Sequence, residues 1–438
     1  MLPDLTLPAS LTALLMVFQP CFTAPTFRTF CGLASGFLAQ TGRRTVCGML
    51  TGAGLSRVWP HDRAHYFFAR ARWSPDQVGL ALARLVVELL VPDGAPVTVA
   101  IDDTLFKRRG KKVWAASWFH DGSAIGAHPV AYGNNWVVAG IVVSVPFLSR
   151  PVCLPVLARL VVKNTTSASR LYLARRLLEI LADTLPGRTI HGVGDAAYSG
   201  KDLRGLDANI TWTTRLRKDA ALYDLPPART GKPGRPKMKG DRLPALKVLA
   251  ARATFTDVIV TRYGKTATMQ AAAITCLWYS VFGPRTVQVI LIRDKTLSGG
   301  YDLALVSTDL TATAAQITER YAARWSIEVA FEDAKQIFGV GDARNRKADA
   351  VRRTVPFALA CQTLTMLWYA TTGHNDADLA DRREHQPWYT TKTQPATADM
   401  ITKLRRVLIA SKYRPSRPDQ PTPAEIHTIQ LAWEDAAA

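Results

Sequence analysis

The sequence lacks the features of membrane, secreted and zinc-binding proteins. No stretch of about 20 apolar residues is free of charges and helix breakers, which excludes a membrane-spanning protein. No Lys or Arg precedes the apolar segment 11–18, so we expect no signal peptide. The six cysteines are scattered without a Cys-x-x-Cys pair, which predicts reduced thiols, a cytosolic protein and no zinc centre. His61 and His65 could share a helix face, but no carboxylate at a suitable offset accompanies them, so metal binding is not expected there.

Acidic residues are also few for a chain of this size. The 438 residues contain 35 Asp and Glu against 55 Lys and Arg, a formal net charge of +20. The hydrophobic content of 48% is enough for ordinary buried cores, which excludes a wholly disordered chain. The basic surplus instead predicts a polyanionic partner, with nucleic acid first and an anionic membrane surface second.

The hydrophobic pattern changes from helical to strand-like near residue 96. Before it, the clearest helix begins at Ser74, where Pro75 suits the first helical position and Gln77 completes a capping box; it ends before Pro92. After it, the pattern predicts a helix over Ser167–Leu185 and strands at Val97–Ile101, Val113–Phe119, Trp136–Val145, Thr189–Val193 and Asn209–Thr214. Two of these strands, Val97–Ile101 and Thr189–Val193, end beside aspartates, and ligand chemistry collects at the carboxyl ends of strands in open α/β sheets.

The second half of the chain contains a basic, strand-rich stretch between helical ones. Residues 215–247 carry ten Lys or Arg and dense Pro and Gly, which predicts a flexible basic loop. Strand patterns follow at Thr254–Thr261, Thr266–Tyr279 and Thr286–Arg293. Helical patterns follow over 311–335 and 354–371, and the remainder from about residue 376 is Pro-rich and basic.

One helical segment carries a regular set of reactive side chains. Tyr321, Arg324, Glu328 and Lys335 are spaced so that an α-helix would present them within an arc of roughly 60°. A solvated helix face with an Arg–Glu pair, worth a few tenths of a kcal/mol, would show the same spacing. The spacing alone does not decide between a solvated face and a functional one.

This segment resembles the Tyr-Arg-Glu-Lys signature of a subgroup of bacterial insertion-sequence transposases of the DDE type. Ile101-Asp102-Asp103-Thr104 resembles the family's first Asp motif, in which the catalytic Asp precedes Thr, and Gly194-Asp195-Ala-Ala-Tyr198 resembles the second. The resemblance extends over roughly residues 97–370. It implies an α/β fold with a ribonuclease-H-like mixed-sheet catalytic core, an inserted β-rich subdomain, and helical N-terminal and C-terminal regions.

The resemblance also implies a division of the chain. We expect a helical N-terminal DNA-binding region over 1–95 and the first part of the core over 96–215. The basic loop and β-rich insertion would occupy 216–300. The second part of the core, with the Glu helix, would occupy 301–375, followed by a basic C-terminal tail over 376–438.

The implied activity is cut-and-paste transposition of an insertion sequence. Such an enzyme cleaves DNA at the element ends, here through a hairpin, and joins them to target DNA. Two Mg²⁺ ions, for which Mn²⁺ could substitute, would be held by Asp103, Asp195 and Glu328. Asp102 is the alternative to Asp103, because adjacent strand residues point to opposite faces and only one can enter the site. The Asp-before-Thr match favours Asp103.

Several other residues are expected to contact DNA. Tyr321, Arg324 and Lys335 would grip phosphates beside the metals. A basic loop just after the first Asp motif would contact the backbone; it comprises Lys107, Arg108, Arg109, Lys111 and Lys112. Lys232–Lys237, with Arg235 at its centre, resembles a minor-groove arm but serves equally as a basic linker. The positive surface would extend to Arg344, Arg346, Lys347, Arg352 and Arg353. Tyr301, Trp278 and Trp325 are alternative aromatics for a flipped base.

The expected partners are double-stranded DNA, as transposon ends and target, and a second copy of the chain in a homodimer on DNA. No membrane partner is expected, and the location would be the bacterial cytoplasm, associated with the nucleoid. Two other functions remain open at this point. One is a domesticated, inactive DNA-binding relative, against which the presence of all three carboxylates argues. The other is a ribonuclease-H-like nuclease that does not transpose.

Overall fold

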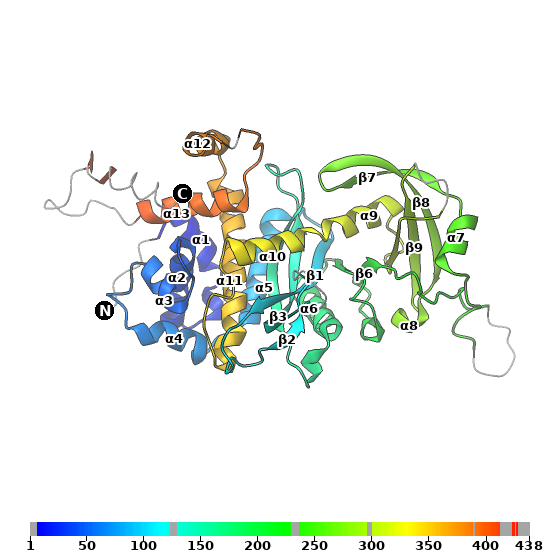
Figure 1. The fold of residues 1–438 in the computed structure, drawn as a ribbon, viewed down its shortest axis with the longest axis horizontal. Coiled ribbons are helices and arrows are strands. Elements are labelled where there is room, and N and C mark those ends of the chain that lie inside the picture. The colour runs from blue at the N-terminus through cyan, green and yellow to red at the C-terminus, as the bar shows by residue number, and fades with distance from the viewer. Residues whose placement is uncertain are drawn as a thin grey trace.

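A computed structural model describes residues 7–122, 129–228, 236–295, 300–388 and 390–411, and four further residues at 423, 424, 426 and 427. A ten-stranded mixed sheet runs through these residues, with a helical region at one end and the inserted strands at the other (Figure 1). No helix in the described part of the chain is long and apolar enough to cross a membrane.

The central strands have the mixed arrangement expected of a ribonuclease-H-like core. β1 (Val97–Lys107) pairs antiparallel with β3 (Val130–Val143), which pairs antiparallel with β4 (Val152–Leu160). On its other side, β1 pairs parallel with β5 (Ile190–Gly194), which pairs parallel with β6 (Ile210–Arg215). β2 (Ser117–His120) pairs with the start of β3. The predicted fold class is confirmed, although the sequence pattern did not predict β4.

The inserted strands extend the core sheet. β10 (Leu303–Ser307) pairs antiparallel with β6, and beyond it lie β9 (Thr286–Arg293), β8 (Lys265–Leu277) and β7 (Thr256–Arg262). Tyr263 and Gly264 join β7 to β8 with positive φ at both positions, as a tight hairpin requires. Two short helices, α7 (Leu246–Arg252) and α8 (Tyr279–Phe282), flank these strands.

The N-terminal region is helical, as predicted. It contains α1 (Ala9–Met16), α2 (Ala24–Ala39), α3 (Val46–Gly52), α4 (His61–Ala69) and α5 (Pro75–Leu90). Pro75 occupies the first turn of α5, but the Ser74 side chain makes no capping hydrogen bond, so the predicted capping box does not form. Single turns of irregular helix occur at Gln19–Cys21, Thr166–Ala168, Lys201–Leu203 and Tyr369–Gly373.

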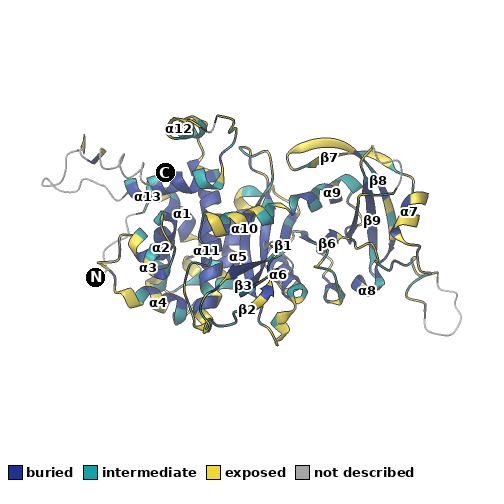
Figure 2. Ribbon diagram, viewed as in Figure 1, coloured by how far each residue is buried: buried dark blue, intermediate teal, exposed yellow. Residues whose placement is uncertain are grey.

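A long buried helix joins this region to the sheet. α11 (Ala348–Trp368) contacts β4, α4 and α5 and is dark blue over most of its length in Figure 2. Its Phe357 ring meets Phe30, Phe67 and Phe68 edge to face, so the two regions share one core. α12 (Asp378–His385) and α13 (Thr397–Ala410) follow, and α13 packs against α2 and α11.

Helices cover both faces of the central strands. On β5, Gly192 lies so close to Leu178 of α6 (Arg170–Thr184) that a side chain would not fit. The neighbouring His191 lies 3.9 Å from Asp309, which is paired with Arg320 of α9 (Ala314–Ala323). Since adjacent strand residues point to opposite faces, α6 and α9 cover opposite faces of the sheet. α10 (Ser326–Gln336) continues from α9 across β1 and β4 (Figure 1).

Candidate active site

Two aspartates meet at one edge of the central sheet. The parallel register of β1 and β5 pairs Ala100 with Val193, and two residues further along it would align Asp102 with Asp195, just beyond β5. Paired residues of parallel strands point to the same face. The Asp195 charge raises the pKa of Asp102, which agrees with this proximity. Asp102 and Asp195 therefore share the sheet face that α9 covers.

Arg324 links this edge to Glu328. It lies where α9 gives way to α10, and a single predicted helix over 311–335 is thus divided in two. The buried guanidinium donates from Nη1 to Asp102 Oδ2 over 3.1 Å and from Nη2 to Glu328 Oε1 over 2.9 Å. One arginine thus holds carboxylates that are more than 200 residues apart in the sequence.

Asp103 faces away from this group. Its Oδ2 accepts from Asn135 Nδ2 at 2.9 Å and lies 3.2 Å from Arg170 Nε, while its Oδ1 accepts from the Tyr198 hydroxyl at 3.0 Å. Asp102, and not the Asp103 that the Asp-before-Thr match favours, is thus the aspartate that Arg324 joins to Glu328. β1 continues to Lys107, so both aspartates lie inside a strand, and strand alternation sends them to opposite faces.

The site concentrates negative charge in a poorly solvated place. Burial raises the pKa of Asp102 to about 7; Arg324 opposes the rise, and Asp195 and Asp103 add to it. Burial also raises the pKa of Tyr198 well above its usual value, and the Asp103 charge acts in the same direction. A divalent cation would relieve this repulsion.

The donor set fits hard divalent cations. Carboxylate oxygens are the ligands that Mg²⁺ and Mn²⁺ prefer. Within the described residues, Asp102, Asp195 and Glu328 do not form a group whose ligand atoms all lie within 4.8 Å of one another.

The other residues of the predicted helix face are divided between two places. Tyr321 is half-buried, and the Arg324 guanidinium lies 5.7 Å from its ring centre. Burial raises the pKa of Tyr321, and Asp195 contributes to the rise, so Tyr321 belongs to the carboxylate group. Lys335 lies elsewhere, near Lys107 and Asp121. Its pKa is lowered overall, because burial and the Lys107 charge outweigh the opposite effect of Asp121.

Comparison with known proteins identifies the family of the chain. A family model described as DDE superfamily endonuclease matches residues 17–282. The chain belongs to this family. The matched range includes both Asp motifs and ends before Glu328. No curated protein matches the chain. Among solved structures, the piggyBac transposase synaptic complex with hairpin DNA is similar at 10% identity and a TM-score of 0.41, over 97% of this chain and 81% of that one.

The basic loop after the first Asp motif contains one buried arginine among exposed cations. Lys107, Arg109, Lys111 and Lys112 are exposed. Arg108 is buried: it donates to Asn134 Oδ1 at 2.9 Å and to the carbonyls of residues 341 and 343 at 2.6 and 2.8 Å. Arg108 is thus placed differently from the exposed DNA contact that the sequence predicts, because its side chain is buried and its Nε and Nη1 groups donate within the protein. Arg235 lies outside the described residues.

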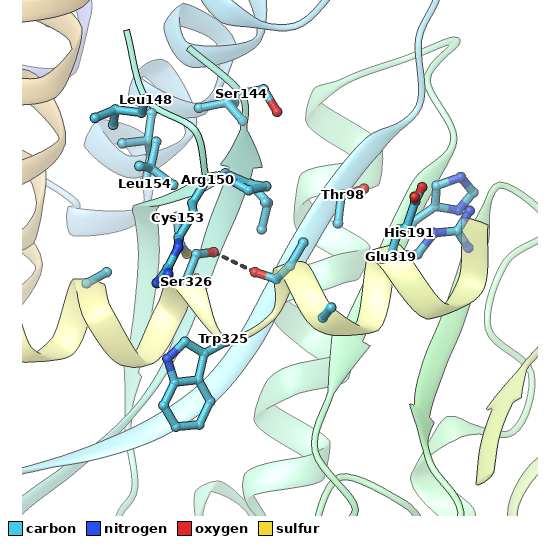
Figure 3. A pocket seen from close by; sticks show the side chains of 18 of the residues that line it. Thr98, Ser144, Leu148, Arg150, Cys153, Leu154, His191, Glu319, Trp325 and Ser326 are labelled. Atoms are coloured by element: carbon cyan, nitrogen blue, oxygen red, sulfur yellow. Dashed lines mark hydrogen bonds between the residues drawn. The ribbon is translucent and has the colours of Figure 1, made fainter. Parts of the chain in front are cut away.

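The three candidate aromatics differ in their exposure to solvent. Trp278 is 5% exposed and packs on Phe282, and Tyr301 is half-buried against the core. Trp325 is 48% exposed, between Arg324 and the start of α10. It points away from the other labelled side chains of a cavity of about 1490 Å³ (Figure 3). The three carboxylates do not line this cavity, so it is separate from the carboxylate site.

Sequence reasoning missed the residues that hold Asp103. Tyr198 belongs to the Gly-Asp-Ala-Ala-Tyr phrase, and its spacing from Asp195 could have suggested a role. Asn135 and Arg170 have no local signal, because they reach Asp103 only through the pairing of β1 with β3 and the packing of α6.

Proposed function

We propose that this chain is a cut-and-paste DNA transposase of an insertion sequence. It would cleave the element ends, through a hairpin, and join them to target DNA. What supports the proposal is the bridge that Arg324 makes between Asp102 on β1 and Glu328 on α10, together with the register that aligns Asp102 with Asp195. The family match supports nuclease chemistry, since it is described as an endonuclease family.

Asp102, Asp195 and Glu328 would hold two Mg²⁺ ions, for which Mn²⁺ could substitute. Bound there, the ions would activate the attacking oxygen and stabilise the leaving 3′ oxygen. Asp103 then has a different role from a ligand. Held by Tyr198, Asn135 and Arg170, it would position β1 and with it Asp102.

The cationic surface would hold the DNA. The exposed Lys107, Arg109, Lys111 and Lys112 follow the strand that carries Asp102, so a phosphate backbone bound there would lie beside the site. Tyr321 and Arg324 would contact the reacting strand. Trp325 is the candidate for stacking a flipped base, because an exposed indole beside the catalytic helix is available to a base and Trp278 is not. We infer a homodimer on DNA, because transposition joins two ends. The location would be the bacterial cytoplasm.

The test is cleavage of DNA that flanks the gene. The full-length protein is incubated with duplexes carrying the flanking inverted repeats and Mg²⁺ or Mn²⁺, and products are separated on a denaturing gel for nicks and hairpins. Glu328→Gln should abolish cleavage and leave binding largely intact. Glu332→Gln is the matched control, since Glu332 is exposed on the same helix.

The outcomes separate the alternatives. Wild-type cleavage by Glu328→Gln would show that the site assignment is wrong. Binding without cleavage by the wild type in either metal would indicate an inactive DNA-binding protein. Cleavage without joining to a target plasmid would indicate a nuclease that does not transpose.

A further inference from the structure

A second group of metal-ligating side chains lies in the N-terminal helical region. Cys47 is on α3, and His61 and His65 are on α4, with residues 53–60 between the two helices. The Cys47 sulfur lies 3.3 Å from His61 Nε2 and 3.8 Å from His65 Nε2, and the two Nε2 atoms lie 3.2 Å apart. The three ligand atoms therefore converge on one point.

We propose that Cys47, His61 and His65 bind a zinc ion that fastens α3 to α4. Zinc binds thiolate at about 2.3 Å and imidazole at about 2.0–2.1 Å in a tetrahedral arrangement. Tetrahedral ligands at these distances are about 3.4 Å apart for two nitrogens and about 3.6 Å apart for nitrogen and sulfur. The separations in this group, 3.2, 3.3 and 3.8 Å, agree with those values.

Hydrogen bonding alone does not satisfy this triangle. A ring nitrogen has a single position in the ring plane, which holds either a proton or a lone pair, so it is a donor or an acceptor and never both. Each Nε2 here has two partners at once, the other Nε2 and the sulfur. Three linear hydrogen bonds among these atoms are therefore impossible, whereas one cation at the centre accepts a lone pair from each of them.

The surroundings of His61 fit a ligating histidine. Its Nδ1, the ring nitrogen directed away from the sulfur, lies 3.5 Å from Asp62 Oδ1. A carboxylate beside the non-ligating nitrogen of a histidine is the usual outer partner at zinc sites, where it fixes the tautomer and makes the ligand more basic. Asp62, directly after His61, thus corrects the expectation that no carboxylate accompanies these histidines.

The ligand set distinguishes this site from the carboxylate site. One thiolate and two imidazoles favour zinc over Mg²⁺ or Mn²⁺, which prefer oxygen. No fourth Cys, His, Asp or Glu of the described chain joins the group, and Cys47 and His61 are exposed. Water would complete the tetrahedron, and the ion would hold two helix ends that are otherwise joined by a short loop.

The experiment uses the full-length protein without a histidine tag, saturated with Mg²⁺ to occupy the carboxylates. It is loaded with Zn²⁺, dialysed and analysed by atomic emission. The wild type should retain one zinc per chain. In Cys47→Ser and in His65→Asn the zinc content should fall about tenfold or more. Cys21→Ser and His120→Asn are matched controls outside the group and should retain it.

Two further measurements separate loss of the site from loss of the fold. Co²⁺ in place of zinc should give the visible bands of a tetrahedral site, with a near-ultraviolet thiolate band absent in Cys47→Ser. In EDTA, the melting midpoint of the wild type should fall to that of Cys47→Ser. Full zinc content in Cys47→Ser, an octahedral Co²⁺ spectrum, or no zinc retained by the wild type would each overturn the proposal. Glu328→Gln should keep its zinc, so the result is independent of the catalytic assignment.

Discussion

The adjacent aspartates Asp102 and Asp103 should respond in opposite ways when each is replaced by Asn. At Asp102 the substitution removes a charge that the fold disfavours: the pKa is about 7 against an ordinary 3.8. That difference corresponds to about 4 kcal/mol between the protonation states. Asn resembles the protonated carboxyl, and the side chain is only 19% exposed. Asp102→Asn should therefore raise the free energy of unfolding by about 2–4 kcal/mol at pH 8 without metal.

The pH dependence of the stability tests the sign of the Asp102→Asn effect independently. Because the folded-state pKa of Asp102 is raised, the protonated carboxyl stabilises the fold, and this contribution is lost as the pH rises from about 4 to about 7. The advantage of Asp102→Asn over the wild type should thus be below about 1 kcal/mol at pH 4 and largest at pH 8. Groups that titrate equally in both proteins cancel from this difference.

At Asp103 the substitution breaks a satisfied network. Oδ2 faces Asn135 and Arg170, and Oδ1 faces Tyr198. An amide that keeps its oxygen toward Asn135 and Arg170 loses the charge that faces Arg170, and it turns the Tyr198 hydroxyl from donor to acceptor. Asp103→Asn should lower the free energy of unfolding by about 1–3 kcal/mol. Its cleavage activity should fall less than that of Asp102→Asn, which loses a proposed metal ligand.

The assay is urea unfolding of both variants and the wild type in EDTA at pH 4 and pH 8, with cleavage measured separately in Mg²⁺. A destabilised Asp102→Asn at pH 8 would refute the argument from buried charge. A cleaving Asp102→Asn beside an inactive, stable Asp103→Asn would reverse the assignment of the two faces.

Two other predictions concern the basic loop and a buried histidine. Arg108→Met should lower the free energy of unfolding by about 2–4 kcal/mol, because the buried guanidinium makes three hydrogen bonds. Arg109→Gln, at an exposed position, should leave the stability unchanged and reduce the salt dependence of DNA binding by about one charge. Urea unfolding measures the first effect, and binding titrations at several salt concentrations measure the second. Equal stability of the two variants would contradict the inward placement of Arg108. Burial, together with Arg320, lowers the pKa of His191 to about 4, and Asp309 opposes this shift. Between pH 7.5 and 5 the unfolded chain binds a proton at His191 and the folded chain does not. The free energy of unfolding of the wild type should therefore fall by about 2 kcal/mol over this range because of His191. His191→Gln should not show this loss of stability in urea unfolding. The same loss in the variant as in the wild type would contradict the role of His191.

Local patterns predicted the fold and part of the site. The strand runs and the helix 167–185 gave the order of the core elements, and the Arg324–Glu328 spacing of four residues forms the contact that it implied. These features depend on neighbouring residues, which the sequence displays directly. That Glu328 belongs with the two Asp motifs was implied by the family resemblance and not by the local pattern.

Features that depend on distant parts of the chain could not be predicted. The sheet face to which the Asp102 side chain points, and its alignment with Asp195, depend on the register of β1 with β5. The Asp-before-Thr match does not encode this register. The burial of Arg108 requires the loop at 341–343, and Cys47 joins His61 through the packing of α3 on α4. In each case the partner is set by packing between segments that no local spacing describes.

The instability of the Asp102 carboxylate is itself informative. A buried acid with a pKa near 7 destabilises a protein at neutral pH, and a fold without a use for that charge would be more stable with Asn there. Arg324 offsets part of the repulsion but sits between the two carboxylates that it joins. A cation that binds the folded chain and not the unfolded one would supply the rest, so Mg²⁺ should stabilise the wild type and not Asp102→Asn. The same arrangement that weakens the metal-free protein would thus prepare it to bind metal.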